Sequence, residues 1–253
     1  MKIYFAGSEP EKYRKELQRV GAECILQSFW ALGQGKTPPS NKQFDYYMLD
    51  SGGYSARIRG VEIDVKQYAA YLNHHKIKYA FNLDTNSVPQ TLANQKYLEE
   101  NTETYIIPIY HLSDWLDPQY RDLIKRYSEN YPFIGLGGSA GASVSAEERK
   151  KFLDYAFSYT KDKVKVHGLG MTADWMLQRY PFFSADSTSW MAIARFAQSR
   201  VHSKDMTKVR AKKRHYMENL APEIQFWMNK QEEITKLWAK RGVTWDNVRR
   251  END

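Results

Sequence analysis

Residues 78–111 read KYAFNLDTNSVPQTLANQKYLEENTETYIIPIYH, and this stretch decides the fold class. It begins and ends with short apolar runs, 78–84 and 104–111, which are typical of buried strands. Residues 88–101, between the two runs, are predicted to be helical. Two strands joined through a helix run parallel, because the helix carries the chain back across the sheet. The stretch therefore predicts a βαβ unit.

The same alternation continues through most of the chain. Eight apolar runs are each followed by a helix or a loop of crossover length, within 253 residues. This count and length favour a closed (β/α)8 TIM barrel over an open doubly wound sheet, which stays the alternative. No GxGxxG sequence opens the first helix, which weakens a dinucleotide-binding interpretation. The predicted strands are 2–7, 23–30, 46–50, 78–84, 104–111, 132–138, 163–170 and 181–186.

Beyond the last predicted strand the chain changes character. Residues 196–253 are first basic, then aromatic and helical. We expect a barrel over residues 1–195 and a C-terminal helical extension over 196–253 that packs against it. The aromatic side chains of Phe226, Trp227 and Trp238 are expected at that contact.

The chain is basic, with a net charge of +7 and a pI of about 9.2. An excess of this size fits either a polyanionic partner, with nucleic acid first, or solubility alone. The clustering of the charge favours nucleic acid. The predicted nucleic-acid-binding residues are Arg195, Arg200, Lys204, Lys208, Arg210, Lys212, Lys213 and Arg214.

Cysteine content and hydropathy predict the setting of the protein. Cys24 is the only cysteine, so neither an internal disulfide nor a Cys-rich zinc site is expected. No segment has the apolar length of a membrane span, and the first residues do not resemble a signal peptide. We expect a cytoplasmic protein with no metal and no membrane partner; the oligomeric state is left open.

Three aspartates follow predicted strands, where catalytic groups of a parallel barrel lie. Asp50 ends YYMLD, Asp84 ends FNLD and Asp186 ends PFFSAD. Any one of them alone is best explained as a helix cap or turn residue. Three carboxylates at one mouth repel each other, and that cost favours a functional site.

Glycines and histidines stand at the same predicted strand ends. The pairs Gly52-Gly53 and Gly137-Gly138 let a flat ligand approach bare backbone, although a phosphate cradle or a tight turn would use them too. His111 is more readily explained as a hydrogen-bonded strand-end histidine, and His167 as a structural one. No spacing of histidines or cysteines indicates a metal site.

The ordered motifs LDSGGYSA, FNLD, IPIYH, FIGLGGSAG, VHGLG and FFSAD resemble those of the tRNA-guanine transglycosylases. The resemblance covers roughly residues 45–190. It implies a TIM barrel that exchanges guanine for a 7-deazaguanine such as preQ0. Those enzymes carry a zinc site of three cysteines and a histidine, which this chain lacks. The chain is more similar to the compact DpdA-type 7-deazaguanine DNA transglycosylases of phages, which implies DNA as the substrate and the host cytoplasm as the location.

The resemblance also implies roles for single residues. Asp186 is the expected nucleophile, and Asp50 is our candidate general acid and base. The second substrate is a free 7-deazaguanine base, and no cofactor is expected. The alternatives are a transglycosylase acting on tRNA, a non-catalytic nucleic-acid-binding barrel, and a phosphate-handling metabolic barrel. The residues expected to bind the base are Ser51, Gly52, Gly53, Tyr54, Asp84, His111, Gly137, Gly138, His167 and Gly168.

Overall fold

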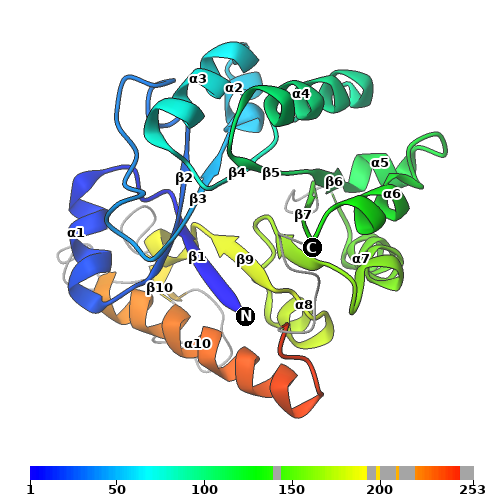
Figure 1. Ribbon diagram of the computed structural model, residues 1–253. Coiled ribbons are helices and arrows are strands. Elements are labelled where there is room, and N and C mark those ends of the chain that lie inside the picture. Colours follow the sequence, from blue (N-terminus) through cyan, green and yellow to red (C-terminus); the bar gives the residue numbers. More distant parts are fainter. Residues whose placement is uncertain (139–143, 193–197, 200–208, 211–219, 246–253) are drawn as a thin grey trace.

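The computed structural model describes residues 1–138, 144–192, 198–199, 209–210 and 220–245. Nine parallel strands form one sheet in the order β5-β4-β3-β2-β1-β9-β8-β7-β6. The strands surround a centre and helices lie outside them (Figure 1). The predicted (β/α)8 barrel is confirmed. The strands are β1 (Lys2–Ala6), β2 (Cys24–Ser28), β3 (Tyr46–Asp50), β4 (Tyr79–Phe81), β5 (Tyr105–Ile107), β6 (Ile109–His111), β7 (Phe133–Gly137), β8 (Lys165–Gly168) and β9 (Ser184–Ser187).

Pro108 divides one predicted strand into β5 and β6. It has no N–H to donate to a ladder, so the strand is interrupted there. The two halves pair on opposite sides, β5 with β4 and β6 with β7. At the junction the Ile107 carbonyl accepts from Asn82 N at 3.1 Å, and the Pro108 carbonyl accepts from Gly135 N at 2.8 Å. Residues 105–111 therefore join the two ends of the sheet and act as one of eight barrel strands.

Helices follow most strands, and polar side chains cap the start of some of them. Ser145 and Glu148 form a capping box at the start of α7, and Ser87 caps α4. The connection 29–45 between β2 and β3 contains no helix. The helices are α1 (Glu11–Val20), α2 (Gly53–Ile58), α3 (Val65–His75), α4 (Val88–Asn101), α5 (Leu112–Leu116), α6 (Leu123–Asn130), α7 (Ala146–Thr160), α8 (Asp174–Arg179), the 3-10 helix η1 (Ser189–Met191) and α10 (Leu220–Lys240).

The long helix α10 belongs to the layer of helices around the barrel. It packs against α1, α8, η1 and β1, and it runs along the outside of β1 in Figure 1. Gln231 Oε1 accepts a hydrogen bond from Ile3 N at 2.7 Å, and Trp238 Nε1 donates to the Leu177 carbonyl at 2.8 Å. Trp227 and Trp238 are buried and Phe226 packs against the core, as predicted. Helix α10 thus takes the place of the helix that follows the last strand.

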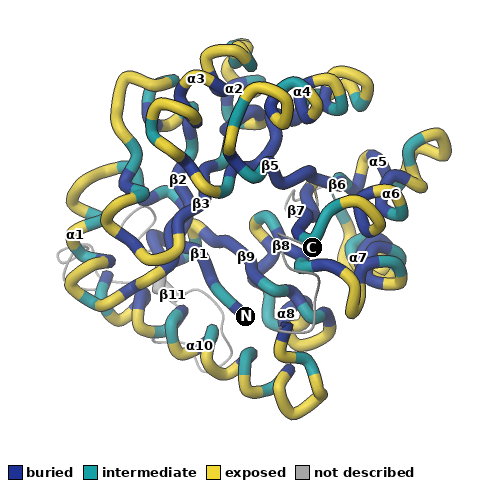
Figure 2. The backbone as a smooth tube through the Cα atoms, in the orientation of Figure 1, coloured by how far each residue is buried: buried dark blue, intermediate teal, exposed yellow. Residues whose placement is uncertain are grey.

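Two apolar regions hold the fold together. The larger lies between the strands and the helices, so the strands and the inner sides of the helices are buried (Figure 2). The smaller fills the barrel itself, as packed layers of strand side chains do in this fold. Within the part of the chain that the structure describes, no helix is long and apolar enough to cross a membrane. The barrel interior consists of Tyr4, Ala6, Cys24, Leu26, Met48, Phe81, Ile107, Ile109 and Phe133.

We expect Trp238→Ala to lower the free energy of unfolding by about 3–5 kcal/mol, because it opens a cavity under α10 and removes the donor of the Leu177 carbonyl. Urea unfolding followed by circular dichroism measures the loss. Trp175→Ala is the matched control, since Trp175 is 37% exposed and should cost about 1 kcal/mol or less. Equal losses in the two variants would contradict the anchoring role of Trp238.

Candidate active site

A cavity of about 750 Å³ lies at the carboxyl ends of the strands. Asp50, the last residue of β3, and Asp186 in β9 both line it. Glu9, just after β1, and Ser28, the last residue of β2, line it as well. Neighbouring parallel strands therefore bring two of the three predicted aspartates, Asp50 and Asp186, to one opening, and Asp84 does not line it.

Asp186 is held through one of its two carboxylate oxygens. Its Oδ1 accepts a hydrogen bond from Gly170 N at 2.9 Å and lies 3.2 Å from His167 Nε2. The other nitrogen of His167, Nδ1, lies 2.8 Å from Ser184 Oγ. If the Ser184 hydroxyl donates a hydrogen bond to Nδ1, the ring carries its proton on Nε2. This N–H then donates a hydrogen bond to Asp186. Among the described residues, none donates a hydrogen bond to Asp186 Oδ2.

Asp50 has an unusual acidity for an aspartate. Burial, together with the nearby charges of Asp84 and Asp186, raises its pKa to about 7. A hydrogen bond from Gly52 N to Asp50 Oδ2 at 3.0 Å opposes the shift without cancelling it. A carboxyl group with this pKa is partly protonated at neutral pH, so it can both give and take a proton.

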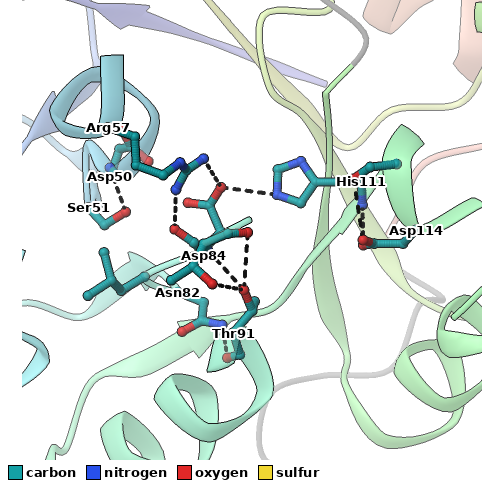
Figure 3. A network of polar contacts seen from close by, with 12 residues as sticks. Asp50, Ser51, Arg57, Asn82, Asp84, Thr91, His111 and Asp114 are labelled. Carbon is teal, nitrogen blue, oxygen red and sulfur yellow. Dashed lines mark hydrogen bonds and ion pairs between the residues drawn. The ribbon is translucent and has the colours of Figure 1, made fainter. Parts of the chain in front are cut away.

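Asp84 is paired with two cationic side chains (Figure 3). Its Oδ2 lies 3.4 Å from Arg57 Nη2 and 3.3 Å from His111 Nε2, and Arg57 Nη1 also donates to the Asp84 carbonyl. Burial works to raise the pKa of Asp84, but His111 and Arg57 hold it below its usual value. Burial in turn works to lower the pKa of His111, and Asp84 outweighs it and raises that pKa. Both pKa shifts favour an ion pair between the two groups.

Side chains from β4 and α4 fix the loop that carries Asp84. Asn82 Nδ2 donates to the Thr91 carbonyl at 2.9 Å, and Asn94 Nδ2 donates to the Leu83 carbonyl at 2.8 Å. Thr85 N donates to Thr91 Oγ1 at 2.9 Å. These bonds place Asp84 beside Asp50 and Arg57 and away from the cavity lining, of which it is not a member.

Steric contacts inside the protein explain why glycine stands at two positions of the predicted glycine pairs. A Cβ on Gly52, whose φ is +76°, would lie 2.3 Å from Ser28 Oγ and 2.5 Å from Trp30 Cβ. A Cβ on Gly137 would lie 2.9 Å from the His111 ring. Both positions require glycine for close packing, so their absence of side chains is explained without a ligand. Contact with a base at these glycines stays a prediction.

The other residues predicted to touch the base differ in their accessibility. Ser51 is fully buried and its Oγ accepts from Gly53 N at 3.3 Å. Tyr54 is 69% exposed. Gly168 packs tightly, since an added Cβ would lie 2.9 Å from Met171 and Phe182. His167 is buried beside Asp186, so it positions the carboxylate and does not face the opening.

Four charged residues of the site were missed in the sequence: Glu9, Lys36 and Arg59 line the cavity, and Arg57 lies beside Asp84. Arg57 lies one helical turn after Gly53 in α2, which directs it toward Asp84. Glu9 follows the first strand, and its Oε1 accepts from Ser28 N at 2.9 Å. The expectation that catalytic groups follow strands, which selected the three aspartates, could also have selected Glu9. Nothing in the sequence pairs Arg57 with Asp84.

Most of the predicted nucleic-acid-binding residues lie outside the described part of the chain. Of Arg210 only the backbone is described, in the strand β11 (Val209–Arg210), which pairs with β10 (Gln198–Ser199). Among the described residues, no group of three His, Cys, Asp or Glu side chains is arranged to hold a metal ion. The residues outside the description are Arg195, Arg200, Lys204, Lys208, Lys212, Lys213 and Arg214.

Comparison with known proteins gives one relative without a known activity. No family model matches the chain. A segment of 163 residues is 29% identical to "Uncharacterized protein 306" of Sulfolobus islandicus rod-shaped virus 1. The match covers 59% of this chain and 51% of the viral protein, so the chain spans about half the length of that relative. The similarity indicates a relative in this virus and names no chemistry.

We expect Asp50→Asn to change how stability depends on pH. The pKa of Asp50 is raised in the folded protein, so folding is favoured less as the pH rises from about 4 to about 7, with no further change above. Asp50 is partly open to the cavity, so we expect the variant to gain about 1–2 kcal/mol over the wild type between pH 4 and pH 8. Urea unfolding at a series of pH values measures the difference.

The matched control is Asp162→Asn, which removes an exposed carboxylate far from the cavity. Asn tolerates the positive φ of +63° at that position. A pH dependence for Asp50→Asn that equals that of the wild type would contradict the raised pKa of Asp50.

Proposed function

We propose that the protein is a DNA-guanine transglycosylase that exchanges guanine in DNA for a free 7-deazaguanine base such as preQ0. One observation carries the proposal. Asp186 is held by one carboxylate oxygen, no described residue donates to the other, and Asp50, whose pKa is about 7, lines the same cavity. A fixed nucleophile beside a carboxyl group that can exchange protons is what double displacement at a sugar carbon needs.

In the first half of the reaction, Asp186 Oδ2 attacks C1′ of the target nucleotide. A bond forms between the carboxylate oxygen and C1′, and the bond between C1′ and guanine N9 breaks with its electron pair going to the base. Asp50 donates its proton to the departing guanine and becomes a carboxylate. The product is a covalent ester between Asp186 and the sugar, and the DNA backbone stays intact.

In the second half, the incoming 7-deazaguanine gives the proton at its N9 position to Asp50. The resulting nitrogen anion attacks C1′ and expels Asp186 as a free carboxylate. Both aspartates return to their starting protonation states, so the cycle is closed. No cofactor takes part, because the second base is itself a substrate.

His167 and Ser184 act in this scheme as positioning residues. His167 Nε2 lies 3.2 Å from one oxygen of Asp186, and Ser184 Oγ orients the ring from 2.8 Å at His167 Nδ1, so the other oxygen of Asp186 is left for attack. A side chain fixed in this way loses little freedom on reaching the transition state. His111 and Arg57 lower the pKa of Asp84, and the negative charge of Asp84 adds to burial in raising the pKa of Asp50.

The choice of DNA rests on the resemblance and on composition. The single cysteine leaves no equivalent of the zinc site of the tRNA enzymes. A target base must leave a duplex to reach the cavity, at a cost of a few kcal/mol that phosphate contacts of the basic residues between 195 and 214 would offset. A tRNA substrate is the alternative, and a non-catalytic nucleic-acid-binding barrel is the second alternative.

We expect Asp186→Asn to abolish guanine exchange and the covalent adduct, because an amide oxygen is a poor nucleophile toward C1′. The loss should exceed about 1,000-fold, while DNA affinity changes less than about three-fold. Release of labelled guanine measures exchange, and a denaturing gel detects the adduct. Asp162→Asn is the control and should keep wild-type exchange. Exchange by Asp186→Asn near the wild-type rate would exclude Asp186 as the nucleophile.

Parallel reactions with duplex DNA, single-stranded DNA and tRNA distinguish the substrates. We expect label to enter or leave DNA and not tRNA, with single-stranded DNA at least as good as duplex because no base has to be flipped. Exchange with tRNA alone would move the proposal to the alternative substrate. Binding of nucleic acid without exchange on any of the three would favour the non-catalytic barrel.

A further inference from the structure

A second cavity, of about 670 Å³, lies at the opposite end of the barrel. Its walls come from the first residues of strands, such as Lys2 of β1, Tyr46 of β3 and Lys165 of β8. The aspartates of the candidate active site lie at or near the last residues of their strands. A five-residue strand spans about 16 Å, and the two cavities share no lining residue. The second cavity is therefore a separate site.

The rim of this cavity is cationic. Four lysines line it, and one carboxylate, Asp45, opposes them, so the formal charge of the lining residues is +3. Ammonium groups gathered around a concave surface repel each other, and an anion between them relieves that repulsion. The cavity thus favours a ligand with negative charge. The lysines are Lys2, Lys76, Lys78 and Lys165.

Its walls are aromatic. Lys2 Nζ lies 3.2 Å from the centre of the Tyr46 ring, and Lys165 Nζ lies 5.1 Å from the centre of the Phe183 ring. These cation–π contacts place two ammonium groups directly beside flat apolar surfaces. Phe133 stands edge-on to Phe183, with 5.5 Å between ring centroids. A ligand in this cavity would therefore contact aromatic rings and lysine ammonium groups at the same place.

The ends of (β/α)8 barrels differ in their usual roles. The amino-terminal end normally contributes stability, and side chains close it. Here the described residues leave a space at that end as large as a small-molecule pocket. Its floor is apolar, with Tyr4 and Met48 buried beneath it. Lysines around an open aromatic cavity add nothing to the packing of the barrel, and this points to binding.

We propose that the amino-terminal end of the barrel is a second binding site, for a ligand that joins an aromatic ring to a phosphate group. The ring stacks on the aromatic wall, and the phosphate contacts the lysines. A nucleotide unit has this chemistry, either as a free mononucleotide or as part of a single strand. The site is independent of the transglycosylase proposal, because it lies at the other end of the barrel.

Isothermal titration of the full chain with thymidine monophosphate tests the site. Thymine is a pyrimidine, so a guanine-selective cavity does not compete for it. We expect a Kd below about 1 mM, and we expect this Kd to rise as salt is added. Thymidine and inorganic phosphate should each bind about ten-fold more weakly or not at all, since each offers half of the contacts. No binding of thymidine monophosphate up to about 10 mM would overturn the proposal.

Lysine variants assign the binding to this cavity. Lys78→Gln, at an exposed position, and the double variant Lys2→Gln with Lys165→Gln should weaken binding by about three-fold and ten-fold or more, respectively. Lys66→Gln, an exposed lysine outside the cavity, is the matched control and should leave the affinity unchanged. Thermal melting shows that each variant is folded. Unchanged affinity in both cavity variants would overturn the assignment.

Two further measurements distinguish a nucleic-acid strand from a free nucleotide as the ligand, and distinguish this binding site from the proposed active site. Pentathymidylate that binds at least ten-fold more tightly than the monophosphate would identify a nucleic-acid strand as the ligand, and equal affinity would identify the free nucleotide. The double variant should keep the ester-forming step at Asp186. Loss of binding with retained chemistry supports this site alone, and loss of chemistry in Asp186→Asn with retained binding concerns the active site alone.

Discussion

Closure of the barrel at residues 105–111 is the constraint on which the rest of the structure depends. This segment pairs with β4 before Pro108 and with β7 after it, so the sheet is nearly closed into a barrel. Closure also brings His111, the last residue of the segment, to within 3.3 Å of Asp84 beyond β4. The same pairing that completes the hydrogen-bond network of the sheet thereby assembles a charged pair next to the carboxylates of the cavity.

The two ends of the barrel differ in charge. Three carboxylates and two cationic side chains, Lys36 and Arg59, line the cavity at the carboxyl end, where burial and the charges of Asp84 and Asp186 raise the pKa of Asp50 to about 7. Lysines gather at the amino end and lie against aromatic rings. An apolar interior of strand side chains separates the two. Each end can thus hold its own ligand with little direct electrostatic coupling to the other.

Much of the fold could be predicted from local patterns. Residues 88–101 form α4 as predicted, and all eight predicted strands are present because each is a short apolar run between polar segments. The expectation that catalytic groups follow strands also brought Asp50 and Asp186 to one cavity. The reasons for the glycines could not be predicted, since they lie in contacts of Gly52 with Trp30 and of Gly137 with His111. Such contacts depend on how separate βα units pack.

The attachment of α10 to β1 has a consequence for synthesis of the chain. Ile3 N donates to Gln231, and Thr235 Oγ1 donates to the Met1 carbonyl at 3.3 Å, so the first strand is covered by almost the last helix. At roughly 5–20 residues per second, a ribosome needs about 10 to 50 s to make the chain between them. During that time the outer face of β1 lacks the cover of α10, although Trp190 can already contact Phe5. The layer of helices around the barrel can therefore be completed only after residues 220–240 have been made.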